Sequence, residues 1–168
     1  MTALEIVRQV QRELRLPQSE SVNEPHARLI LDFANKVQRS LMLENVVWDE
    51  LKEYGYFDTE AGKAIYTVSV VNNGEIDVIR SLQIGNDYPL IKKSDEEFRE
   101  LKRLFTGNGK PLYYRHLSRI GGSIVVELLP VPDASYSVNA EVLIKPPRLV
   151  NDTDIPLLDP DTIILGTI

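Results

Sequence analysis

Apolar residues recur every three or four positions in the first third of the chain, which is the spacing of amphipathic helices. A first helix is predicted to begin after Thr2, because Thr2 and Glu5 have the spacing of a capping box. Its apolar stripe comprises Leu4, Val7, Val10 and Leu14. A second helix is predicted from Pro25, whose fixed φ suits the first helical position. Its buried face comprises Ile30, Phe33, Ala34, Val37 and Leu41. A shorter helix is predicted from Val47 to Tyr54.

The pattern changes after Gly55, where β-branched and aromatic residues alternate with polar ones, as strands do. Strands are predicted at residues 65–71, 77–84, 112–117, 124–129 and 136–144, with turns at Asn73-Gly74, Gly121-Gly122 and Pro130–Asp133. Ser94 is placed to cap a helix that runs to about Phe105, with Phe98, Leu101 and Leu104 on its apolar face. Asp159 or Asp161 could cap a last helix near Thr162.

This order of elements predicts an α+β fold rather than an alternating parallel sheet. An N-terminal helical hairpin or bundle, residues 1–54, is expected to precede an antiparallel β domain, residues 55–168. The inserted helix covers about residues 94–105, and the two parts are expected to form one compact unit.

The charge balance narrows the function. The net charge is −6, from 19 Lys and Arg against 25 Asp and Glu. That balance argues against a general nucleic-acid binder and against a polybasic membrane patch. The chain has no cysteine, which excludes disulfides and thiolate sites. No signal-peptide core or membrane-spanning apolar window is present, so no membrane association is expected.

Candidate catalytic chemistry is sparse. His26 and His116 are the two imidazoles, and neither lies in a nucleophile or zinc-binding motif. Residues 107–110, Gly-Asn-Gly-Lys, lack the full spacing of a phosphate-binding loop and read as a turn. The aspartates of residues 152–161 lack the glycine and glutamate of a calcium-binding loop. The sequence therefore predicts a protein that is not an enzyme, with no catalytic residues, no cofactor and no metal.

Three stretches resemble the small head-to-tail adaptor proteins of tailed bacteriophages, the connector or neck proteins found beneath the portal. They are Trp48-Asp49-Glu50-Leu51 with Phe57–Gly62 and Tyr66; Gly109–Tyr114; and Leu129–Val138, followed by Lys145-Pro146-Pro147-Arg148-Leu149 and Asp152–Leu158. The order of proline-x-proline-aspartate, tyrosine, strand, lysine-proline-proline and leucine carries most of the likeness.

The resemblance implies a structural subunit of the virion neck, made in the host bacterial cytoplasm. Such adaptors form a closed ring, usually a dodecamer, between the portal protein and the tail tube, nozzle or a second neck protein. The helices would pack into a collar and the β domain would face the tail. Double-stranded DNA would pass through the lumen without being read, and related chains commonly continue with a longer terminal helix.

Tyrosines are the candidate interface residues, because a small core holds few tyrosines whose hydroxyls need partners. Interfaces also favour aromatic residues and arginine at their centres. The candidates are Tyr54, Tyr56, Tyr88, Tyr113, Tyr114 and Arg148. Tyr113 and Tyr114 are adjacent in a predicted strand, so one is expected in the core and the other outside. Ordinary positions at sheet edges would also explain these tyrosines.

Two other classes of function remain open on the sequence. One is a soluble α+β binding or regulatory module unrelated to virions, which would stay monomeric even with a portal. The other is an enzyme whose site matches no familiar motif, and the shortage of histidine and cysteine argues against it.

Overall fold

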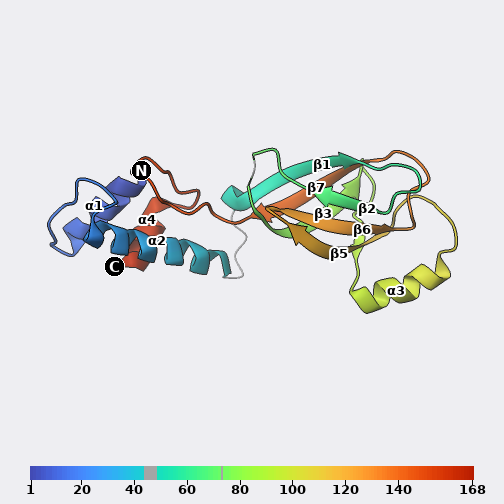
Figure 1. Cartoon of the computed structure of the whole chain (residues 1–168), viewed down its shortest axis with the longest axis horizontal. Helices are drawn as coiled ribbons and strands as arrows, with labels where there is room; N and C mark the ends of the chain where they lie inside the picture. The colour runs from blue at the N-terminus through green and yellow to red at the C-terminus, as the bar shows by residue number, and fades with distance from the viewer. Residues whose placement is uncertain (44–48, 73) are drawn as a thin grey trace. The chain divides into compact units, whose positions relative to one another are not determined.

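The structure, a computed structural model, describes residues 1–43, 49–72 and 74–168. The chain divides into two compact units, which Figure 1 shows in sequence colours. A helical unit contains Met1–Leu51 and Lys145–Ile168, and a β unit contains Lys52–Ile144. The helices and largely antiparallel sheets confirm the α+β class predicted from the sequence.

The helical unit forms where local capping signals predicted helices. It contains α1 (Ala3–Glu13), α2 (Pro25–Leu43), the 3-10 helix η1 (Asp49–Leu51) and α4 (Pro160–Thr167). Thr2 and Glu5 form the predicted capping box of α1, and Pro25 is the first residue of α2. Asp159 caps α4 by accepting a hydrogen bond from the Thr162 amide at 2.9 Å.

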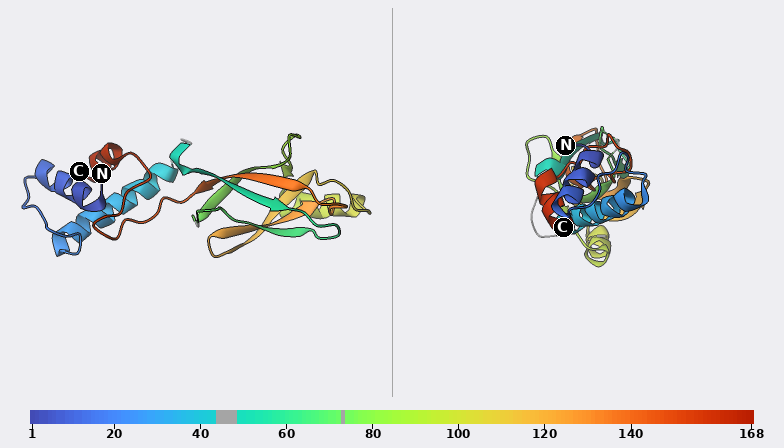
Figure 2. Two further views of the ribbon diagram at one scale, coloured as in Figure 1. Left: turned by 90° about the horizontal axis from the view of Figure 1, so that it is seen from above. Right: turned by 90° about the vertical axis from the view of Figure 1, so that its left-hand side faces the viewer.

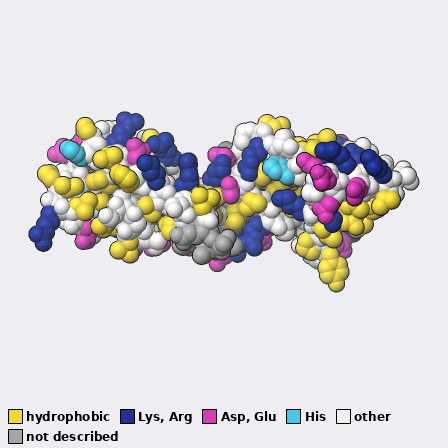
Figure 3. Space-filling model, turned by 90° about the horizontal axis from the view of Figure 1, so that it is seen from below, with side chains coloured by type: hydrophobic (Ala, Val, Ile, Leu, Met, Phe, Trp, Pro, Cys, Tyr) yellow, Lys and Arg dark blue, Asp and Glu magenta, His cyan; other side chains and the backbone are white. Residues whose placement is uncertain are grey.

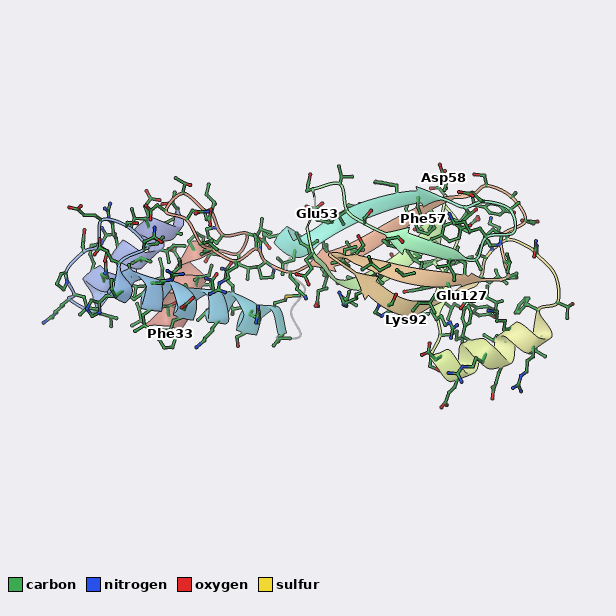
Figure 4. The ribbon with its side chains drawn as sticks, viewed as in Figure 1. Phe33, Glu53, Phe57, Asp58, Lys92 and Glu127 are labelled. Carbon is green, nitrogen blue, oxygen red and sulfur yellow. The ribbon has the colours of Figure 1, made fainter. Side chains whose placement is uncertain are left out.

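The buried face of α2 is narrower than predicted. Ile30 and Ala34 are buried, as their spacing indicates. Phe33 is 47% exposed, although it was predicted on the buried face, and the Lys36 ammonium lies 5.1 Å from the centre of its ring. Figure 4 shows this side chain pointing outward from α2. A phenylalanine can match the spacing of a buried helical face and still be exposed, because the neighbouring elements need not cover every position on that face.

The predicted helix from Val47 to Tyr54 differs from the structure. Its first two residues lie outside the described part of the chain, and its middle is the single turn η1. From Lys52 the chain is instead strand β1 (Lys52–Asp58), paired along its whole length with a later strand. Gly55 allows this path, because a Cβ there would lie 2.4 Å from the Ser69 carbonyl oxygen. Long-range strand pairing thus replaces the helix that local spacing predicted.

The contacts also divide the chain differently from the sequence, which placed residues 145–168 in the β domain. This segment packs on the N-terminal helices. The amides of Ala3 and Leu4 donate to the carbonyls of Asp154 and Asp152 at 2.7 and 3.2 Å. The first turn of α1 therefore finds partners for two of its free amides in the C-terminal segment.

Two polar side chains hold the returning segment to the helical unit. The Asn35 side chain donates to the Leu149 carbonyl at 2.9 Å and accepts from the Leu149 amide at 2.8 Å. The Asp152 carboxylate accepts from the Val22 amide at 2.7 Å and from the Ser21 hydroxyl at 3.2 Å. These bonds join residues 114 to 131 positions apart, a distance over which no local pattern is informative.

The β unit contains two sheets. A three-stranded sheet has the order β1-β7-β3, and a four-stranded sheet has the order β2-β6-β5-β4. The remaining strands are β2 (Ile65–Val68), β3 (Ile76–Ile84), β4 (Ile91–Lys92), β5 (Tyr113–Ile120), β6 (Ser123–Leu129) and β7 (Ser137–Ile144). Side chains of both sheets form one apolar core, and its fully buried members include Ile76, Leu82, Val126, Val138, Ala140 and Val142.

One strand pair departs from the predicted antiparallel domain. The pair β4–β5 is parallel, with Lys92 opposite Tyr114, and the other pairs are antiparallel. Helix α3 (Asp95–Leu104) connects these two strands, and a parallel pair needs such a crossover. Ser94 caps α3 in a capping box with Glu97, as predicted.

Helix α3 lies outside the two sheets (Figures 1 and 2) and makes one deep apolar contact. Phe98 is fully buried, whereas Leu104, predicted on the same apolar face, is 77% exposed. Charged groups supply the remaining attachment. The Glu127 carboxylate, buried on β6, receives the Lys102 ammonium from α3 and the Arg115 guanidinium from β5, the latter at 2.6 Å. Figure 4 labels Glu127 on the side of the sheet that faces α3.

We expect this attachment to weaken in acid. Burial acts to raise the pKa of Glu127, but hydrogen bonds from Lys102 and Arg115 and their charges outweigh it, so its pKa lies below the ordinary 4.5. A lowered pKa in the folded state stabilises the fold above the unfolded value, and that stabilisation is lost as the pH falls through the folded value. Urea unfolding curves recorded over a range of pH should show this loss of stability below about pH 4.5.

The variant Glu127→Gln distinguishes the contribution of the Glu127 charge to the acid dependence from that of the other carboxylates. It should lower the free energy of unfolding at pH 7 by about 1–3 kcal/mol, because two cations lose a charged acceptor. It should also flatten the acid dependence. Glu96→Gln, on the exposed face of α3, is the matched control. An acid dependence equal to that of the wild type would contradict the role given to Glu127.

Candidate assembly surfaces

Three loops meet at one end of the β unit and form a loop platform, defined here as residues 59–64, 105–112 and 130–136. This is the end opposite the one where the chain enters β1 and leaves β7. The Gly62 amide donates to the Pro132 carbonyl at 2.8 Å, and the Gly109 amide donates to the Val131 carbonyl at 2.9 Å. The middle loop 130–136 therefore holds the other two.

Thr59 fixes the same loops from inside. Its side chain is buried, and its hydroxyl donates to the Ala134 carbonyl at 2.9 Å while accepting from the Tyr136 amide at 2.8 Å. The Tyr136 hydroxyl donates to Asp133 at 2.7 Å, and this bond raises the pKa of Tyr136. The platform is thus fixed by specific hydrogen bonds, although it is made of loops.

Tyr88 projects from the loop after β3, beside the platform. Its side chain is 95% exposed. The loop is ordered by the Gln83 side chain, which donates to the Asp87 carbonyl at 2.6 Å, and by an ion pair between Asp87 and Lys110. A fully exposed aromatic side chain on an anchored loop is suited to contact another protein, because little ordering entropy is lost on binding.

Tyr54 and Tyr56 form an exposed aromatic pair on the outer face of β1. They are 51% and 68% exposed and lie opposite Glu141 and Asn139 of β7. Residues two apart in a strand share a face, so the two rings are neighbours on the sheet surface. β1 is at the edge of its sheet, which makes this face accessible from the side.

The other three candidates are placed differently. Tyr114 is 3% exposed and its ring belongs to the core, so it is not part of an exposed aromatic surface. Tyr113 points the other way and packs against Phe105, with ring centres 6.0 Å apart. Arg148 belongs to the helical unit, where it pairs with Asp32 at 2.8 Å. Tyr113 and Tyr114 face opposite sides of the sheet, as expected of adjacent strand residues. The six candidates do not form one patch.

Thr59, Asp133 and Tyr136 hold the platform together, although none of them is among the interface candidates that the sequence indicates. The available signal was the clustering of polar residues and prolines around residues 130–136. The described part of the chain holds no group of three or more His, Asp or Glu side chains placed to bind a metal. Within residues 1–43, 49–72 and 74–168, every helix is too short or too polar to span a lipid bilayer.

Comparison with known families decides the relationship of this chain. Residues 1–167 match the family model described as SU10 adaptor protein. The chain belongs to the SU10 adaptor protein family. This confirms the resemblance to phage adaptors that the sequence indicated, and it supports a structural adaptor of a phage. The sequence matches no curated protein.

Most of the stretches that carried the resemblance lie in two places in the adaptor, and Trp48 of the first stretch lies outside the described residues. The loop platform is where three of these stretches meet, residues 57–62, 109–114 and 129–138. Tyr66 helps to hold the first of its loops, because its hydroxyl donates to the Lys63 carbonyl at 2.7 Å. The stretches 145–149 and 152–158 instead bind the helices. The stretches that resemble the family therefore lie where hydrogen bonds join residues that are far apart in the sequence of each unit.

The platform depends on one hydroxyl, which gives a direct test. Replacing Thr59 by valine keeps its shape but leaves the Ala134 carbonyl and Tyr136 amide without that partner. We expect the free energy of unfolding to fall by about 1–3 kcal/mol. Amide hydrogen exchange should accelerate in residues 130–136. Thr59→Ser retains the hydroxyl and is the control; equal protection in all three proteins would show that the bond does not order the platform.

Proposed function

We propose that this adaptor joins the portal to the tail of a tailed phage as one subunit of a closed ring. Family membership over residues 1–167 is the observation that carries the proposal. The proposed partners are the portal protein on one side and the tail tube, nozzle or second neck protein on the other. We further propose a ring of twelve copies, as the resemblance implies, with the genome passing through its lumen.

The proposed ring requires heterologous contacts, in which one face of each subunit meets a different face of the next. The exposed pair Tyr54 and Tyr56 and the anchored Tyr88 supply aromatic surface of the kind found at interface centres. We assign Tyr54 and Tyr56 to the contact between copies. We assign the loop platform with Tyr88 to the tail side, and the helical unit to the collar.

The charge of the adaptor suits a conduit that releases DNA. A net charge of −6 provides few opportunities to replace counterions along the phosphate backbone, so the grip on DNA is weak. Acidic, basic and apolar side chains are interspersed on the face of the β unit seen in Figure 3. Such a mixed surface favours weak association in solution and assembly on a portal template.

Particles assembled without the adaptor test the place of this protein in the virion. They should package DNA but lose it or fail to join tails, because the adaptor acts after packaging. Electron microscopy of the particles and nuclease protection of their DNA measure both effects. Restoring the gene is the control, and a normal yield of infectious particles without the protein would contradict the proposal.

The tyrosine pair is tested by the double variant Tyr54→Ser/Tyr56→Ser. Because both side chains are exposed, the free energy of unfolding should change by less than about 0.5–1 kcal/mol. Ring formation on the portal, followed by native mass spectrometry, should be lost. Tyr114→Ala is the contrasting variant and should cost about 3–5 kcal/mol in stability. Normal rings from the double variant would remove the pair from the interface.

A further inference from the structure

A small polar cavity lies at the margin of the core, between β3 of one sheet and β4 and β5 of the other. Its volume is about 60 Å³. The polar side chains that line it are Asp77, Lys92, Tyr114, His116 and Arg119. None of these residues lies on the loop platform or in the exposed tyrosine pair, so the cavity is separate from both surfaces.

The pairing of β5 with β6 determines which side chains of β5 face the cavity. Tyr114 and His116 lie opposite Leu128 and Val126, which belong to the core, and therefore share the inner face. Strict alternation would turn Arg119 outward. A register shift between His116 and Ser118 inserts one residue, and Arg119 then lies opposite the core residue Ile124. β-Bulges commonly re-aim a side chain in this way.

Several donors in the cavity have no acceptor in the described part of the chain. The Tyr114 hydroxyl makes no hydrogen bond to the described residues, and Tyr114 lines the cavity although the residue is only 3% exposed. Burial also raises the pKa of Tyr114, so its hydroxyl remains a donor. The Lys92 ammonium likewise has no ion-pair partner among those residues, and Figure 4 labels its side chain beside β5.

Arg119 contributes more donors than the protein uses. Its guanidinium donates to the carbonyls of Ile76 and Asp77 on β3. A guanidinium has five N–H groups, so three remain after these two bonds. Lys92 and Arg119 are exposed, so water solvates their remaining donors, and an anion would replace that water with charge-assisted hydrogen bonds.

The charge and volume of the cavity indicate the ligand. Lys92 and Arg119 carry two positive charges against one negative charge on Asp77, which leaves an excess suited to a singly charged anion. The volume of about 60 Å³ corresponds to roughly four water-sized spheres. A carboxylate fits this space. A phosphodiester within duplex DNA does not, because it carries a sugar on each side.

We propose that this pocket receives an acidic side chain from a neighbouring copy of the chain. The inference rests on the ring assembly proposed above, since only an assembly supplies such a neighbour. Each copy has 25 acidic against 19 basic residues, so adjacent copies repel unless basic sites accept acidic groups. A concave basic site with unused donors meets that requirement.

Acetate is the probe for the pocket itself. Amide NMR spectra of the isolated full chain are recorded while sodium acetate replaces sodium chloride at constant ionic strength. Chemical-shift changes should be confined to residues around Asp77, Lys92 and 114–119. Changes that are absent or spread over the surface would overturn the site, and a stronger response to inorganic phosphate would overturn the choice of carboxylate.

Conservative variants test the donors. Tyr114→Phe removes one hydroxyl and keeps the ring in the core, and it should weaken acetate binding about tenfold, the loss expected for a hydrogen bond to a charged group. Lys92→Gln should weaken it similarly. Tyr113→Phe, altered at the adjacent residue on the opposite face, is the matched control. Unchanged acetate affinity in both pocket variants would overturn the proposal.

Ring formation on the portal tests the origin of the carboxylate. Tyr114→Phe and Lys92→Gln should form rings at higher protein concentration than the wild type, and Tyr113→Phe should not. Variants that lose acetate but assemble like the wild type would overturn the assignment to a neighbouring copy. A wild-type chain that forms no ring would instead refute the proposed function, and the acetate titration would still decide the pocket.

Discussion

The β unit depends on the burial of strand β7. Its inward side chains Val138, Ala140 and Val142 have no solvent exposure, and its backbone pairs with both β1 and β3. β1 precedes this strand by about 80 residues of sequence, so the three-stranded sheet closes only when the end of the β unit returns to its beginning. The segment after β7 then completes the helical unit through Asn35 and Asp152. The last part of the chain, from β7 onward, thus completes both units.

Charged groups are placed inside the β unit only where the geometry supplies partners. Glu127 is tolerated on β6 because cations from β5 and α3 reach it. Arg119 is exposed but is held at the margin of the core, because the carbonyls of Ile76 and Asp77 accept hydrogen bonds from its guanidinium. Lys92 and Tyr114, at the same margin, lack acceptors in the described residues, and this contrast is the reason to expect a ligand there.

The surfaces assigned to assembly share a rigid base. Tyr54 and Tyr56 project from a strand paired along its length, and Tyr88 projects from a loop anchored by Gln83 and Lys110. The loop platform is fixed by backbone hydrogen bonds and by the hydroxyl of Thr59. A subunit built in this way would lose little conformational entropy on joining the proposed ring, so modest exposed aromatic surfaces would be enough to support it.

Local signals in the sequence determined the helices α1, α2, α3 and α4, five of the strands and the α+β class, because capping residues and periodicity act within a few positions. They also determined that Tyr113 and Tyr114 face opposite ways. Tertiary structure alone decided that Lys52–Asp58 is a strand, that residues 145–168 join the helices, and that Tyr114 rather than Tyr113 is buried. It also decided the bulge that places Arg119 opposite the core residue Ile124. Each of these outcomes depends on pairing between residues far apart in sequence, whose free energy local patterns do not contain.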